Sequence, residues 1–318
     1  MHVPTRESVR ELLSLDSSYD EWLAELDRVG PPDTTLTPAS MEDTACLLDR
    51  LGFATEDAAD ALATRIQPGE HPELWWLLER CHHAVVRGLG PDAPRWTIPR
   101  LPDELGPHGR FFQLHVLLSG VEPLREWHTQ RGIPDDVSWA TLRDLARGVA
   151  IHRATYGYAG LDKAFWLAHH FHGELYELGR LQFELRAGAL GLHIPATGPL
   201  TPQACDASLA AANVFVERFF PDPDRRRVVC TSWLLDEQLA DYLPADANIV
   251  RFQRRFTLNQ DVIVDDLEPL RFIFRKIPTD LAELPRDSTL QRALLDHLQR
   301  GGHWRIRTGW FPWEPSSS

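Results

Sequence analysis

The chain of 318 residues has no long apolar stretch and no excess of positive charge. No window reaches the ~18 apolar residues needed to cross a bilayer, and the start, MHVPTRESVRELL, lacks the apolar segment of a secretion signal. The net charge of −13 argues against a general nucleic-acid binder, which normally presents a basic face. We therefore expect a cytoplasmic protein that binds neither membranes nor nucleic acid.

Cysteine is scarce and dispersed. Cys46, Cys81, Cys205 and Cys230 form no C-x-x-C pair, so neither a zinc cage nor a redox motif is indicated. The segment HHFHGE (169–174) places histidines three apart on one helical face, but no carboxylate lies at a diagnostic spacing. We interpret it as a helix surface and expect free thiols and no metal.

Apolar residues recur at three- and four-residue spacing through the first half, which predicts helices there. Ser40 and Gly52 are typical residues for the start and end of one of them. A chain of this length favours two domains. We place a helical domain at 1–135 and a second domain at 136–318, with the proline-rich stretch 90–107 as a linker or irregular loop. The expected helices are 7–15, 18–29, 40–52, 56–67, 71–90, 111–132, 138–157 and 162–172.

The second half mixes both kinds of element, so the predicted fold class is α+β. Strands are expected at 174–186, 226–233, 248–258, 270–277 and 303–311, and helices at 201–220, 234–244 and 289–300. The segment 179–195 is expected to be extended, with Gly179, Gly188 and Gly191 as turn or bulge points. The loop 196–200 carries the chain into the helix that follows it. Unpaired backbone N–H groups at such a helix start suit the pyrophosphate of a cofactor such as coenzyme A.

The strings GRLQFEL, LHIPATGPLT, VCTSWLLDEQLADYLP and NIVRFQRRFTL resemble a bacterial family of two-domain acyltransferases. Its members join a helical N-terminal domain to a C-terminal domain like that of the GCN5-related N-acyltransferases (GNAT). The resemblance implies transfer of an acyl group from acyl-CoA to an amine by direct attack. It leaves open an acyl carrier protein as donor and a small molecule or a peptide as acceptor.

The resemblance also implies that the loop before the long helix holds the cofactor. Gly198 permits a turn conformation, and Thr201 before Pro202 fits the cap and the first helical position. The usual Q/R-x-x-G-x-G/A signature is missing, which reduces the number of amide donors and leaves weakened or altered CoA binding open. The predicted cofactor-binding residues are Ile194, Pro195, Ala196, Thr197, Gly198, Pro199, Leu200 and Thr201.

Four side chains are candidates for the proton transfers. Glu184 or His193 could accept the amine proton, although Glu184 could equally be an outward strand residue and His193 a hydrogen-bonded core histidine. Tyr242 or Ser232 could protonate the departing thiolate, with a surface role for Tyr242 as the alternative. The arginines at 225–227 could meet the 3′-phosphate of CoA or form a solvated turn.

Three other functions remain open at this level. A catalytically degenerate member would bind acyl-CoA as a sensor, which the missing signature favours. An enzyme with a thiol nucleophile would use Cys230 or Cys205. A protein-interaction module would use the tryptophan-rich helical half.

Overall fold

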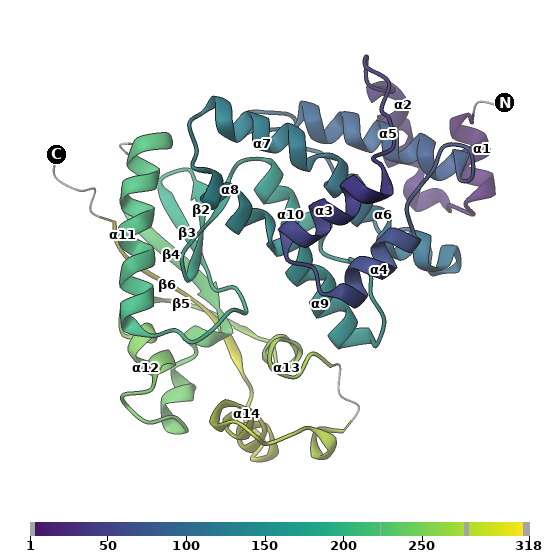
Figure 1. Cartoon of the computed structure of the whole chain (residues 1–318). Coiled ribbons are helices and arrows are strands. Elements are labelled where there is room, and N and C mark those ends of the chain that lie inside the picture. Colours follow the sequence, from purple (N-terminus) through teal and green to yellow (C-terminus); the bar gives the residue numbers. More distant parts are fainter. Residues whose placement is uncertain (1–3, 223, 277–279, 314–318) are drawn as a thin grey trace. The chain divides into compact units, whose positions relative to one another are not determined.

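The computed structural model describes residues 4–222, 224–276 and 280–313. The chain divides into two compact units, Met1–Glu174 and Leu175–Ser318 (Figure 1). None of the helices in the described ranges is long and apolar enough to span a membrane.

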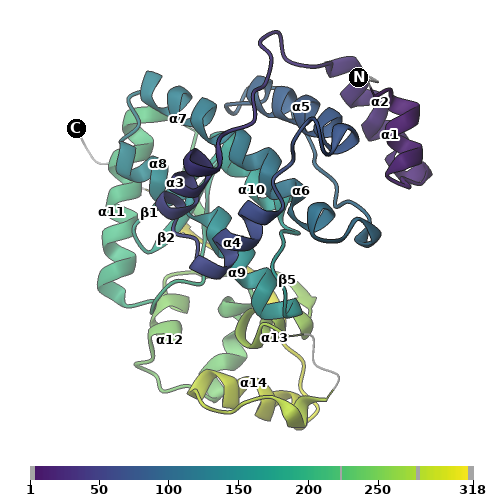
Figure 2. The same cartoon turned by 45° about the vertical axis from the view of Figure 1, so that its right-hand side comes forward.

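The N-terminal unit is helical, as predicted. Ser40 caps α3 by accepting a hydrogen bond from the N–H of Asp43, and Gly52 ends that helix in a left-handed conformation. Helices α5 and α6 pack side by side in its core (Figure 2). Its helices are α1 (Arg6–Leu12), α2 (Asp20–Val29), α3 (Met41–Leu51), α4 (Thr55–Ala63), α5 (Pro72–Arg87), α6 (Gly106–Ser119), α7 (Val121–Gln130), α8 (Asp135–Leu142), α9 (Asp144–Tyr156) and α10 (Ala164–Phe171).

The boundary between the units lies later in the chain than the expected position near 135. Helices α8, α9 and α10 belong to the N-terminal core, because Trp139, Leu145 and Phe171 are buried in its apolar cluster. The proline-rich stretch 90–107 is irregular, as expected, but Trp96 is buried in the same cluster. It is therefore part of the helical unit rather than a linker between domains.

The C-terminal unit is built on a six-stranded sheet in its described residues, with the order β1-β2-β3-β4-β6-β5. Neighbouring strands are antiparallel except β3 and β4, which are parallel. Helix α11 lies along one face of the sheet, and α12, α13 and α14 gather at one end of it (Figures 1 and 2). The elements are β1 (Leu175–Leu178), β2 (Leu181–Arg186), β3 (Ala189–His193), α11 (Pro202–Phe219), β4 (Arg227–Ser232), α12 (Asn248–Gln253), β5 (Thr257–Val264), α13 (Leu267–Phe274), α14 (Thr289–Gln299) and β6 (Arg305–Pro312).

Two predicted strands are wrong. The segment 248–258 begins as helix α12 and becomes strand only at β5, and most of 270–277 falls in helix α13. Asp265 starts α13 by accepting hydrogen bonds from the N–H groups of Leu267 and Glu268. Leu270 and Phe274 are buried four residues apart, which is the helical period. Apolar runs of this length fit a helix or a strand equally well, so the cap was the deciding signal.

Candidate active site

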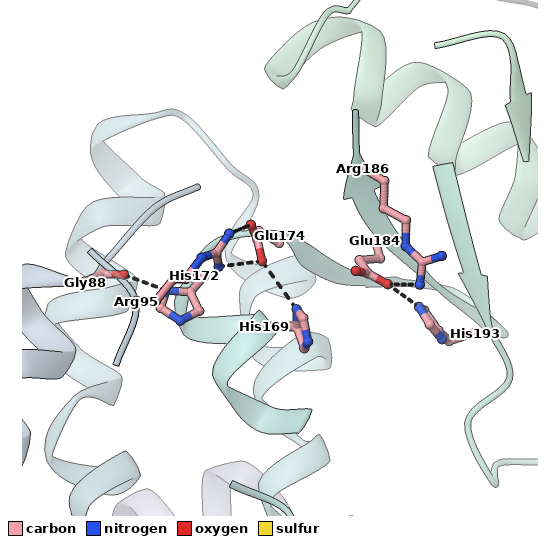
Figure 3. Close-up of polar contacts among 8 residues, drawn as sticks. All are labelled: Gly88, Arg95, His169, His172, Glu174, Glu184, Arg186 and His193. Atoms are coloured by element: carbon pink, nitrogen blue, oxygen red, sulfur yellow. Dashed lines mark hydrogen bonds and ion pairs between the residues drawn. The ribbon is translucent and has the colours of Figure 1, made fainter. Parts of the chain in front are cut away.

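Three charged or titratable side chains meet on one face of β2 and β3 (Figure 3). Glu184 pairs with Gly191 across the two strands, which places His193 diagonally opposite Glu184 on the same face. His193 Nε2 lies 2.7 Å from Glu184 Oε2, and Arg186 Nη2 donates to the same oxygen at 2.5 Å. Glu184 and His193, the two candidate bases, therefore form one hydrogen-bonded pair.

The environment of Glu184 fixes its protonation state. Burial disfavours its charge, but hydrogen bonds from His193 and Arg186 outweigh burial and hold the pKa of Glu184 at about 2. An ionised carboxylate can only accept, so His193 Nε2 must donate its hydrogen. In the neutral imidazole the lone pair then resides on Nδ1. In this pair Glu184 orients the imidazole, and His193 is the candidate base.

Gly191 makes room for the arginine of this group. A Cβ atom at Gly191 would lie 2.9 Å from Arg186 Nε and 3.1 Å from Glu184 Cβ. A larger residue there would push the guanidinium away from the carboxylate. Glycine at position 191 is therefore needed by the site, because it leaves the space that the Arg186 side chain occupies.

The loop that follows His193 opens onto a cavity of about 520 Å³ within the C-terminal unit. Parallel pairing between β3 and β4 is confined to Leu190–Val228 and Gly191–Val229, although both strands continue beyond it. The ends of β3 and β4 that no longer pair with each other, and the loop, are therefore at the same end of the sheet. The predicted cofactor-binding residues that line the cavity are Ile194, Pro195, Ala196, Thr197, Gly198, Pro199 and Leu200.

The helix start beside this loop has few amide donors, as the missing signature predicts. Thr201 caps α11 as predicted, but its hydroxyl takes the N–H of Ala204 at 3.3 Å. Pro202 has no N–H, and the N–H of Cys205 bonds to the Thr201 carbonyl. In the first turn, the N–H of Gln203 is therefore the donor that has no hydrogen-bond partner among the described residues.

Arg180 supplies positive charge at the loop, and no sequence motif singled it out. Its guanidinium donates to the carbonyls of Pro199, Pro195 and Gly198 at 3.2, 3.0 and 2.9 Å. The N–H of Arg180 bonds to Ser208 Oγ, which fixes the turn between β1 and β2 to α11. An arginine at a hairpin tip is usually solvated, but here it lines the cavity and holds the loop in shape.

The two candidate acids have different surroundings. The hydroxyl of Tyr242 lies 3.1 Å from His297 Nδ1, while His297 Nε2 lies 3.2 Å from the carbonyl of His303. His297 therefore donates a hydrogen bond through Nε2 and accepts one from the Tyr242 hydroxyl through Nδ1. Ser232 Oγ accepts the N–H of Leu234 at 3.1 Å, which leaves its own proton to be donated elsewhere. Tyr242 is thus hydrogen-bonded to α14, and Ser232 lies at the end of β4, where β4 pairs with β6 but no longer with β3.

Neither cysteine proposed as a nucleophile is accessible. Cys230 and Cys205 are each 1% exposed. Burial raises the pKa of Cys230 to about 12 and also raises the pKa of Cys205. Both are buried, protonated thiols, which argues against the alternative of a thiol nucleophile.

A second polar cluster lies in the helical unit and uses the histidine-rich segment (Figure 3). Arg95 pairs with Glu174, and His169 Nδ1 lies 3.3 Å from the same carboxylate. His172 Nδ1 donates to the carbonyl of Gly88 at 2.9 Å. No group of three or more metal-binding side chains is found in the part of the chain that the structure describes. These histidines stabilise the fold.

The fold and the site together define a GNAT-like acyltransferase. Residues 175–311 match the GNAT-like C-terminal domain family, and residues 42–173 match the N-acyltransferase N-terminal domain family. The two matches meet at the boundary between the structural units. No curated protein matches the chain.

Solved structures of acyltransferases resemble this chain along nearly its whole length. An acyltransferase in complex with decanoyl-CoA and teicoplanin is 42% identical, with 97% of this chain and 99% of that chain covered and a TM-score of 0.91. Another, in complex with decanoyl-CoA, is 39% identical, with 98% and 100% covered and a TM-score of 0.93. The chain belongs to this family of two-domain N-acyltransferases and is an enzyme of the GNAT-like class.

Proposed function

We propose that the enzyme transfers an acyl group from acyl-CoA to a primary amine of a glycopeptide acceptor. The observation that carries this proposal is the cavity lined by 194–200, which opens directly after the His193–Glu184 pair. Similar acyltransferases have been crystallised with decanoyl-CoA and teicoplanin, which supports this donor and this acceptor class.

In the proposed reaction the amine attacks the thioester carbonyl directly. His193 Nδ1 takes the proton that the amine loses, and Glu184 holds the imidazole in the required tautomer. The C–S bond then breaks as the C–N amide bond is completed. Ser232, rather than Tyr242, donates a hydrogen bond to the departing thiolate, and the proton that His193 took from the amine is then transferred to the sulfur to give the thiol of CoA. The loop 194–200 and Arg180 bind the diphosphate of the donor.

The test is an acylation assay with decanoyl-CoA and a teicoplanin derivative that carries a free amine. Product is detected by mass spectrometry and CoA release by a thiol reagent. We expect His193→Asn to lower kcat/KM by about 10²- to 10⁴-fold, the usual contribution of a general base, and to leave CoA affinity close to wild type. Full activity of this variant would instead assign the pair a structural role. If the wild type binds CoA but shows no turnover, the alternative of a catalytically degenerate acyl-CoA sensor would be favoured.

A further inference from the structure

The cavity beside the loop is positively charged although the protein is strongly acidic. Arg180 and Arg275 line it, and none of its described lining residues is acidic. The whole chain carries a net charge of −13. A cation-only lining in such a chain favours an anionic ligand, because a partly buried guanidinium without a counter-charge costs free energy.

Arg180 and Arg275 differ in how their donors are used. Three N–H groups of Arg180 are bonded to loop carbonyls. Arg275 lies over the ring of Phe272, with Cζ 4.9 Å from the ring centroid, and no carboxylate of the described residues pairs with it. Burial lowers the pKa of Arg275, as expected for a cation whose charge is not offset by protein groups. The guanidinium N–H groups of Arg275 are therefore more available to a ligand than those of Arg180.

The backbone of Arg275 is also unusual. It ends α13 in the left-handed region at φ 52°, a conformation that a non-glycine residue adopts at a cost. Such strain concentrates at ligand sites, where the surrounding structure maintains it. The strained conformation and the unpaired guanidinium are independent observations, and both lie at the wall of the same cavity.

This wall is formed by helices α13 and α14, which lie between β5 and β6 in the chain. They bring Phe272, Ile273, Thr289 and Leu290 to the cavity. An aromatic ring and aliphatic side chains next to an arginine suit a purine nucleoside that carries a phosphate. The loop 194–200 contributes another part of the lining, so one elongated ligand could contact both.

We propose that Arg275 binds the 3′-phosphate of CoA and that the cavity wall formed by α13 and the start of α14 receives the phosphoadenosine half of the donor. This assignment rests on the proposed function, which supplies acyl-CoA as the ligand. A phosphate monoester accepts two parallel hydrogen bonds from a guanidinium, which gives both affinity and selectivity. The arginines at 225–227 are a poorer candidate, because Arg225 is buried and donates to the carbonyl of Phe220.

The test compares CoA with dephospho-CoA, which lacks only the 3′-phosphate. Dissociation constants are measured by titration calorimetry on the full-length wild type, Arg275→Gln and Arg275→Gly. Glycine takes the left-handed backbone without strain, so that variant preserves the turn. We expect both substitutions to weaken CoA binding by about 10- to 100-fold, the range for hydrogen bonds to a charged group, and to leave dephospho-CoA binding nearly unchanged. The matched control is Arg271→Gln, on the same helix but outside the cavity lining.

Equal weakening of both ligands by the Arg275 substitutions, or no weakening of either, overturns the assignment. The acylation assay with decanoyl-CoA separates this result from failure of the proposed function. If the wild type turns over but its Arg275 variants bind CoA and dephospho-CoA with equal losses, the proposed function stands and only the 3′-phosphate assignment fails. If the wild type neither binds CoA nor turns over, both proposals fail.

Discussion

Among single residues, Glu184 and His193 have to be considered as one unit. A glutamate on β2 and a histidine on β3 are both visible in the sequence, but their pairing depends on the strand register, which the sequence does not give. The register sets Gln182 opposite His193 and Gly191 opposite Glu184. Arg186 then adds a second hydrogen bond to the carboxylate, and this bond could not be predicted either.

A double-mutant cycle tests whether the pair works as a unit. Glu184→Ala removes the acceptor that holds His193 in its tautomer, so we expect a loss of kcat/KM approaching that of His193→Asn, about 10²-fold or more. The double variant should lose little beyond His193→Asn alone, because both changes disable the same proton transfer. Glu184→Gln retains an acceptor oxygen and should recover part of the loss. Strictly additive effects would show that the two residues act separately.

Among the elements, the strand–loop–helix at 189–219 was the most predictable part of the fold. Its signals were local: Gly198 in the turn, and Thr201 as the cap before Pro202. The same holds for Ser288, which forms a capping box with Gln291 at the start of α14. The short apolar segments 248–258 and 270–277 were predicted less well, because such runs fit a helix or a strand and the cap at Asp265 was not recognised in the sequence. The role of Arg180 was missed because the loop that it contacts begins some distance further along the chain.

The shape of the loop 194–200 should depend on Arg180. Lysine at this position keeps the charge but cannot reach three separated carbonyls from one planar group. We expect Arg180→Lys to raise KM for acyl-CoA by about tenfold, with a smaller change in kcat, and to make the loop more sensitive to proteolysis. Steady-state kinetics and limited proteolysis measure the two effects. Arg218→Lys, on α11 outside the cavity, is the control, and an unchanged KM for Arg180→Lys would refute the dependence.

For the whole molecule, the two-unit organisation was predictable but the boundary was not. Helices look alike in sequence whichever core they join, so α8, α9 and α10 gave no sign that they complete the N-terminal unit. The change from helical to alternating apolar pattern at β1 is the better marker of the boundary. It coincides with the division found in the structure.

Each unit contains a carboxylate that is buried or largely buried and that should make the unit sensitive to acid. Burial opposes the charge of Glu174 in the helical unit, but hydrogen bonds from His169 and Arg95 hold its pKa at about 2. The pKa of Glu184 in the other unit is also about 2, against an ordinary value of 4.5 for both. Because folding lowers both pKa values, the stabilisation is complete above pH 4.5 and is lost as the pH falls toward 2.

Glutamine at either position should therefore lower the free energy of unfolding near pH 7, and the difference from wild type should vanish near pH 2. Urea titrations of the full-length protein across this range, followed by tryptophan fluorescence, measure that difference. Glu104→Gln removes an exposed carboxyl without a hydrogen-bond partner in the described residues, and it should track the wild type throughout. A gap between wild type and Glu184→Gln that stays constant from pH 7 to pH 2 would mean that the carboxylate contributes through packing rather than through its charge.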